Sequence, residues 1–307
     1  MADVTSLSRS ILETLAYSDI FDHPLTVYEL HRFATMPCSL EEIIECLPAL
    51  KEASSREGYY FLSGRGFIVE LRKERQKVSR PHFERAVRYG QMMARLPFFR
   101  MVAISGSLAM LNLTSGHDMD FMLVARRGRV WTVRAFALLI NRAANFYGDV
   151  VCPNIIVSES TLEWKARNLY AAREIAQLHL IWGEETYNKF RISNMWIGEF
   201  LPNLRERDAG ILNPIVKGEH VPETIQRCGE YLMDGRLGDF LEGWERKRKI
   251  NKLSAEKGAG LETEFNEEVC QGNFNHHGYW AMKAYGDRLK ALGIDQPSFH
   301  VEDLVDA

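Results

Sequence analysis

Two aspartates, Asp118 and Asp120, are the residues of this sequence best suited to chemistry, because they stand two apart within an apolar run. In an extended strand, residues two apart project from the same face, with backbones roughly 7 Å apart. Two carboxylates that converge in this way form an oxygen site of the kind that Mg²⁺ prefers. Like charges side by side make ionisation costly, so a cation would stabilise the pair. The spacing therefore predicts a site for Mg²⁺, with Mn²⁺ as an alternative, at these aspartates.

A Gly-Ser pair, Gly106 and Ser107, follows an apolar strand pattern over 98–105 and precedes Asp118 by ten intervening residues. Glycine lets the backbone approach a phosphate oxygen, and serine offers an N–H and a hydroxyl. A short helix over 108–111 would add its positive end. Gly106 and Ser107 are therefore candidate phosphate-binding residues.

The segment Ile104–Val124 resembles the signature of the DNA polymerase β-like nucleotidyltransferase superfamily, in which a Gly-Ser pair precedes Asp-x-Asp in a strand. The resemblance implies that Asp118 and Asp120 bind Mg²⁺ carrying an NTP, and that Gly106 and Ser107 contact its phosphates. It also implies in-line attack by an acceptor hydroxyl on the α-phosphorus, with release of pyrophosphate.

The superfamily uses a third carboxylate on a later strand, and this sequence departs from that pattern. The strand pattern over 150–157 has Asn154 in its middle, while Asp149 and Glu159 lie at its two ends. An amide oxygen can contact a metal, but it cannot act as a base. The two acids have the opposite parity from Asn154, unless a bulge at Pro153 shifts the register. We predict Asn154 as the third catalytic-site residue, with Asp149 or Glu159 as alternatives and an incomplete site also open.

The N-terminal region alternates helix patterns with β-rich runs. Thr26 with Glu29, and Ser39 with Glu42, are capping-box patterns that predict two helix starts. Two later β-rich runs, residues 59–62 and 67–69, flank a glycine turn and predict a hairpin.

Three helices followed by a hairpin resemble a winged-helix domain. The third helix pattern, over 39–50, contains three glutamates and no Lys or Arg. Because DNA phosphates would repel such a helix, DNA binding is the less favoured role. A module that packs on protein or positions a substrate is favoured.

These patterns predict an α+β protein of three parts. Residues 1–78 form a winged-helix-like module, and residues 79–160 form the nucleotidyltransferase core. The resemblance implies that this core is a small mixed sheet with helices on one side. Residues 161–307 form a C-terminal helical domain that covers the cleft, with one long helix over 162–182.

The whole chain is also similar to a bacterial group of nucleotidyltransferase-domain proteins with an N-terminal winged-helix-like region. The shared pieces are Cys-Pro-Asn at 152–154, Asn-x-Trp-Ile at 194–197 and Leu-Pro-Asn at 201–203. This likeness implies no particular substrate.

Composition limits the classes of protein that the sequence can encode. The chain has 307 residues, 46% of them hydrophobic, and a formal net charge of -3. A strongly basic nucleic-acid binder is therefore disfavoured. Five cysteines without a CxxC spacing, and no signal peptide or membrane-length apolar run, predict a cytoplasmic protein without a membrane partner.

The main functional expectation is a Mg²⁺-dependent enzyme that transfers NMP from an NTP to an acceptor hydroxyl. A small-molecule acceptor suits the acidic chain better than RNA does, and a protein acceptor is also compatible. The alternative is a catalytically inactive nucleotide-sensing or DNA-binding regulator that keeps the fold. Nucleotide binding without turnover would distinguish the regulator from the enzyme.

Overall fold

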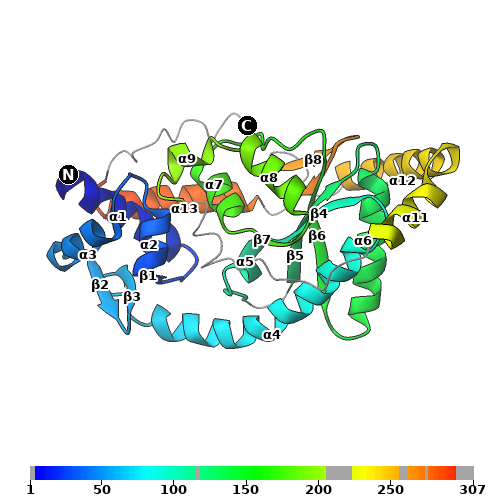
Figure 1. The fold of residues 1–307 in the computed structure, drawn as a ribbon. Helices are drawn as coiled ribbons and strands as arrows, with labels where there is room; N and C mark the ends of the chain where they lie inside the picture. The colour runs from blue at the N-terminus through cyan, green and yellow to red at the C-terminus, as the bar shows by residue number, and fades with distance from the viewer. Residues whose placement is uncertain (1–3, 115–117, 205–222, 256–261, 274–275, 295–307) are drawn as a thin grey trace.

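The computed structural model describes residues 4–114, 118–204, 223–255, 262–273 and 276–294, which form a mixed α and β structure with two sheets (Figure 1). The N-terminal module comprises α1 (Val4–Asp19), β1 (Leu25–Thr26), α2 (Val27–Phe33), α3 (Leu40–Cys46), β2 (Ala53–Arg56) and β3 (Tyr59–Leu62), with a 3₁₀ turn η1 (Leu47–Ala49) after α3. Its antiparallel sheet has the order β1-β3-β2.

Side-chain capping sets the starts of α2 and α3, as the sequence predicts. The Thr26 side chain accepts from the backbone of Glu29, and the Glu29 side chain accepts from the backbone of Thr26. Ser39 and Glu42 form the same reciprocal pair at α3. Each box satisfies two backbone donors that a helix start would otherwise leave without partners.

The hairpin lies earlier in the chain than the β-rich runs 59–62 and 67–69 predict. Strands β2 and β3 flank Glu57 and Gly58, whose φ angles of 54° and 80° suit a two-residue turn that matches the strand twist. The prediction of a strand over 67–69 is therefore wrong. Ile68 and Val69 instead begin α4 and are buried against Phe61 of β3.

Helix α4 (Ile68–Ala94) connects the module to the larger sheet. Its 27 residues span about 40 Å, and it runs along one side of the molecule from the module to β4 (Figure 1). Near its start, Arg72 donates two hydrogen bonds of 2.8 Å to the carboxylate of Glu29 in α2. Both side chains are buried, so this ion pair fixes α2 against α4.

The larger sheet is mixed and has six strands, ordered β7-β4-β5-β6-β9-β8. They are β4 (Phe99–Ile104), β5 (Asp118–Ala125), β6 (Val150–Ser158), β7 (His179–Trp182), β8 (Thr263–Phe265) and β9 (Val269–Gly272). Strands β5 and β6 are parallel, and the other neighbours are antiparallel. The sheet therefore extends beyond residues 79–160, because β7, β8 and β9 come from the region that was expected to be helical.

Helices cover both faces of this sheet, whereas the family resemblance implies helices on one side. The first face packs on α4, α6 (Val130–Asn145) and α12 (Arg236–Ser254), which follows α11 (Glu223–Met233). The second face packs on α7 (Leu169–Ala176), α8 (Glu184–Ser193), α9 (Ile197–Phe200) and α13 (His277–Ala291). Met119, Phe121 and Leu123 are fully buried on the first face, as predicted from their alternation with the aspartates.

The prediction of one long helix over 162–182 is wrong. Asn168 starts α7 by accepting a 2.9 Å hydrogen bond from the backbone of Ala171. The helix ends at Ala176, and the β-rich sequence His179–Trp182 pairs with β4 instead. Among the described residues, no helix has both the length and the apolar character needed to cross a lipid bilayer.

Candidate functional site

Strand β5 carries both aspartates on the second face of the sheet. Asp118 begins the strand and is exposed, whereas Asp120 is partly buried. Strand alternation places them on the same face as Met122 and Val124, which pack into the core of the second face. The pair therefore stands where β5 emerges from that core.

The Gly-Ser turn lies directly against Asp120. The backbone N–H of Ser105, just after β4, donates a 2.9 Å hydrogen bond to the Asp120 carbonyl. Gly106 follows with φ of +64°, and a Cβ placed on it would lie 2.6 Å from Asp120 Oδ2. Gly106 and Ser107 then begin the short helix α5 (Gly106–Ala109), and Ser107 is exposed. The fold thus brings the glycine turn and the metal-binding candidates together.

Replacing Gly106 with alanine should disturb the Asp120 carboxylate and weaken Mg²⁺-dependent nucleotide binding. Gly128→Ala is a matched control, because Gly128 has φ of +71° but no atom within 4 Å of an added Cβ. Both variants should lose about 1 kcal/mol of unfolding free energy from backbone strain. The Gly106 variant should lose more than the Gly128 variant, because its Cβ would lie 2.6 Å from Asp120 Oδ2. Thermal unfolding with Mg²⁺ and an NTP should show weaker nucleotide stabilisation in the Gly106 variant alone. Equal nucleotide stabilisation in the two variants would contradict this reading of Gly106.

The residue of β6 that pairs with Asp120 is Cys152, not Asn154. The register pairs Asp120 with Cys152 and Phe121 with Pro153, and then shifts so that Met122 pairs with Ile155. Asn154 is thus the extra residue of a bulge. The bulge lies where Pro153 predicts a shift of register. The Cys152 thiol is hydrogen bonded to the Asp120 carboxylate.

The two acids considered as alternatives to Asn154 are held by other groups. Arg85 Nε contacts both oxygens of Asp149 at 3.0 Å, and the Tyr89 hydroxyl donates to it at 2.9 Å. Glu159 lies at the opposite end of β5, where its backbone N–H bonds to Ala125. Its carboxylate accepts from the backbone of Arg127 at 3.1 Å. Neither acid is positioned beside Asp120.

Glu174 of α7 is a carboxylate near Asp120 that the sequence patterns do not identify. Burial, together with the negative charge of Asp120, raises the pKa of Glu174 to about 7. Gln177 Nε2 donates a 2.6 Å hydrogen bond to its Oε1. The signal that could have identified it is a single acidic residue in the alanine-rich segment 169–176, whose one other charged residue is Arg173.

The charge around Asp120 is suited to a cation. The pKa of Asp120 is raised to about 6, mainly by burial. The hydrogen bond from Cys152 opposes this rise, and the negative charge of Asp118 adds a smaller rise. Among the described residues, no group of three His, Cys, Asp or Glu side chains could hold a metal ion. Mg²⁺ commonly binds one or two carboxylates and completes its coordination with water and substrate phosphates. The Asp118–Asp120 pair fits that ligand set.

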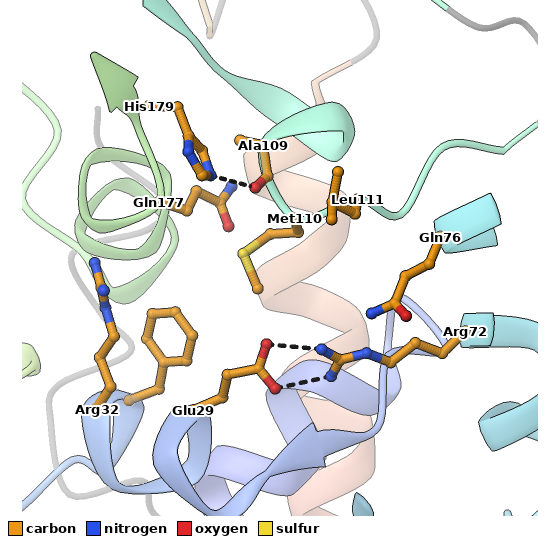
Figure 2. A pocket seen from close by; sticks show the side chains of 10 residues that line it. Glu29, Arg32, Arg72, Gln76, Ala109, Met110, Leu111, Gln177 and His179 are labelled. Carbon is orange, nitrogen blue, oxygen red and sulfur yellow. Dashed lines mark hydrogen bonds and ion pairs between the residues drawn. The ribbon is translucent and has the colours of Figure 1, made fainter. Parts of the chain in front are cut away.

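A cavity of about 200 Å³ lies between the N-terminal module, the end of α5 and β7, and we call it the module cavity (Figure 2). Its charged groups already have protein partners. Arg72 bonds to Glu29, His179 contacts the Ala109 carbonyl at 2.7 Å, and Arg32 donates to the Ala176 carbonyl at 2.6 Å. These contacts join the module to α4 and α7 and join β7 to α5, so the cavity wall has a structural role.

A second cavity, of about 110 Å³, lies beside α7 and contains Asn154 and Glu174 among its lining residues. We call it the α7 cavity. Asn154 therefore lines a cavity near the aspartates, although Cys152 occupies the position next to Asp120.

No protein-family model, no curated protein and no solved structure matches this chain.

Proposed function

We propose that this protein is a cytoplasmic, Mg²⁺-dependent nucleotidyltransferase that transfers NMP from an NTP to an acceptor hydroxyl. The observation that carries the proposal is the contact between the glycine turn and the carboxylate pair, where Gly106 approaches Asp120 too closely to allow a Cβ. A turn that can approach phosphate and a pair of carboxylates that can hold Mg²⁺ are the two parts that bind an NTP. The free cysteines of the described structure agree with a reducing compartment.

Each part of the site has a chemical role in this proposal. Asp118 and Asp120 would hold Mg²⁺, which would neutralise charge on the phosphate oxygens when bound. Gly106 and Ser107 would contact the phosphates and orient the α-phosphorus for in-line attack. The acceptor oxygen would form the new bond to that phosphorus, and pyrophosphate would leave on the opposite side.

The N-terminal module would support the site and not read DNA. Its element order and its β1-β3-β2 sheet are compatible with a winged-helix-like module. Exposed Glu41 and Glu45 on α3 would repel a phosphate backbone. The opposite side of the module packs on the site region, since Arg32 of α2 bonds to the end of α7.

An inactive, nucleotide-binding regulator is the second candidate, and one observation favours it. The β6 residue beside Asp120 is a thiol, whose pKa burial and the nearby carboxylates raise well above its usual value. A neutral thiol supplies neither the charge nor the basicity of a third carboxylate. Mg²⁺-dependent NTP binding without pyrophosphate release would support the regulator.

Thermal unfolding with each NTP, with and without Mg²⁺, tests the proposal. An NTP at 100 times its Kd should raise the unfolding free energy by about 2.7 kcal/mol, and only when Mg²⁺ is present. Pyrophosphate release in the presence of candidate acceptors then separates enzyme from regulator. A shift that is the same without Mg²⁺, or no shift with any NTP, would contradict the proposal.

A further inference from the structure

The α7 cavity has mostly apolar walls with a few polar groups, which suits a small ligand that has both kinds of surface. Trp164, Tyr170 and Ile155 are among its apolar lining residues, and its polar groups include the amides of Asn154 and Gln271 and the carboxylates of Glu174 and Glu262. None of the described residues that line it is Lys, Arg or His. An anionic ligand would therefore find no charge partner there, whereas a neutral or positively charged ligand would.

The two carboxylates of the cavity differ in how much of their bonding capacity is used. Glu262 accepts from the backbone N–H groups of Gly278 at 3.1 Å and Tyr279 at 2.6 Å, and so satisfies the start of α13. Glu174 accepts from Gln177, which is its one donor among the described residues. Glu174 is therefore the carboxylate with capacity left for a ligand.

The cavity adjoins the candidate nucleotide site. Asn154 follows Cys152, the partner of Asp120, by two residues on β6, and as the extra residue of the bulge it lies in the cavity wall. The charge of Asp120 also acts on Glu174 and Tyr170, which line the cavity from α7. A molecule in the cavity would thus lie close to the Asp120 carboxylate.

The size of the cavity limits the ligand further. A volume of about 110 Å³ has room for several water molecules, hence for one small ring, but not for a peptide or nucleic-acid strand. Amide groups can bind hydroxyls in both directions. Tyr170 and Tyr279 offer apolar ring faces, and an ammonium group can bind both a carboxylate and an aromatic face.

We propose that the α7 cavity binds the acceptor, and that the acceptor is a small polyhydroxylated primary amine whose ammonium group pairs with Glu174. This assignment rests on the proposed nucleotidyl transfer. One acceptor hydroxyl oxygen forms a bond to the α-phosphorus of the NTP, and the bond from that phosphorus to the bridging oxygen breaks. Pyrophosphate leaves with the bonding electron pair, and the hydroxyl proton passes to water.

Three sugars that share the same ring but carry a positive, a neutral or a negative charge test the assignment. Glucosamine, glucose and glucuronate should be titrated into the full chain and followed by ligand-observed NMR. Glucosamine should bind most tightly and glucuronate most weakly. The Glu174→Gln variant should weaken glucosamine binding about tenfold by loss of a charge-assisted hydrogen bond, with little change for glucose. Glu184→Gln, an exposed glutamate on α8, is the matched control and should change neither.

Separate readouts distinguish failure of this assignment from failure of the proposed function. Equal or tighter binding of glucuronate, no binding of any sugar, or unchanged glucosamine binding in Glu174→Gln would overturn the cavity assignment. In protein that binds Mg²⁺ and NTP, glucosamine should increase pyrophosphate release more than glucose does. Glucosamine binding without that increase would overturn the acceptor role. Glucosamine binding that depends on Glu174, in protein with no NTP response, would refute nucleotidyl transfer and leave a cation-binding cavity.

Discussion

Replacing Asp118 and Asp120 together with asparagine should lower nucleotide transfer by at least about 10³-fold, because both proposed metal ligands lose their charge. The same double variant should lose the stabilisation that an NTP gives in the presence of Mg²⁺. Pyrophosphate release and thermal unfolding measure the two effects on one preparation.

The double variant should nevertheless remain folded without metal. Asp120 is a partly buried carboxylate beside another carboxylate, and its ionised form is therefore costly in the metal-free protein. Asparagine keeps the shape and removes that cost, so the unfolding temperature without Mg²⁺ should equal or exceed that of the wild type. Glu159→Gln, at the other end of β5, is the control and should retain transfer. Transfer that survives in the double asparagine variant would refute the site.

Replacing Arg72 with methionine should lower the free energy of unfolding by about 3–5 kcal/mol, because the buried Glu29 carboxylate loses the positive charge that pairs with it. Burial alone would raise the pKa of Glu29, but the Arg72 charge and hydrogen bonds lower it to about 2. The stabilisation from this low pKa is present above pH 4.5, the usual value, and is lost as the pH falls toward 2. Urea unfolding at neutral pH measures the loss.

Arg56→Met provides the matched comparison for the Arg72 variant. Arg56 also pairs with a glutamate, at 3.0 Å from Glu70, but the two side chains are 43% and 59% exposed. Its loss should cost less than about 1 kcal/mol. Adding Glu29→Gln to Arg72→Met should recover part of the lost stability, since no buried charge then remains. Equal losses of unfolding free energy in the Arg56→Met and Arg72→Met variants would show that burial does not determine how much each ion pair stabilises the fold.

The parts of the fold that could be predicted from the sequence are those with local causes. The capping residues Thr26 and Ser39 act on backbone groups three positions away, so their patterns identify helix starts correctly. Alternation within β5 correctly separates the aspartates from the buried residues between and after them. Both signals lie within one turn of helix or one strand.

The missed elements depend on distant partners. His179–Trp182 has apolar residues that suit either a helix or a strand. The segment forms a strand because it pairs with β4. Strands β8 and β9 likewise join the sheet only because β6 offers an edge to β9. Ranges such as 179–182 therefore require knowledge of their neighbours before their structure can be assigned.

In the candidate site, too, the features with local causes could be predicted from the sequence, and those that depend on distant partners could not. The order of Gly106, Ser107, Asp118 and Asp120 anticipates the contact between the turn and β5. The alignment of β6 depends on where the bulge falls, and a shift of one residue is enough to exchange the neighbours of Asp120. Glu174 reaches the site from a helix that the strand pattern does not reveal.

The packing of α1 against α13 has a consequence for synthesis of the protein. Asp19, at the end of α1, bonds to Arg288 of α13 at 2.7 Å and to Arg65 at 2.7 Å. On the ribosome, Arg65 emerges soon after Asp19, but Arg288 emerges only after all the strands of the sheet have been translated. The apolar side of α1 that includes Ala16 and Tyr17 therefore stays exposed until most of the chain has been synthesised. During that interval the nascent chain would need protection from aggregation.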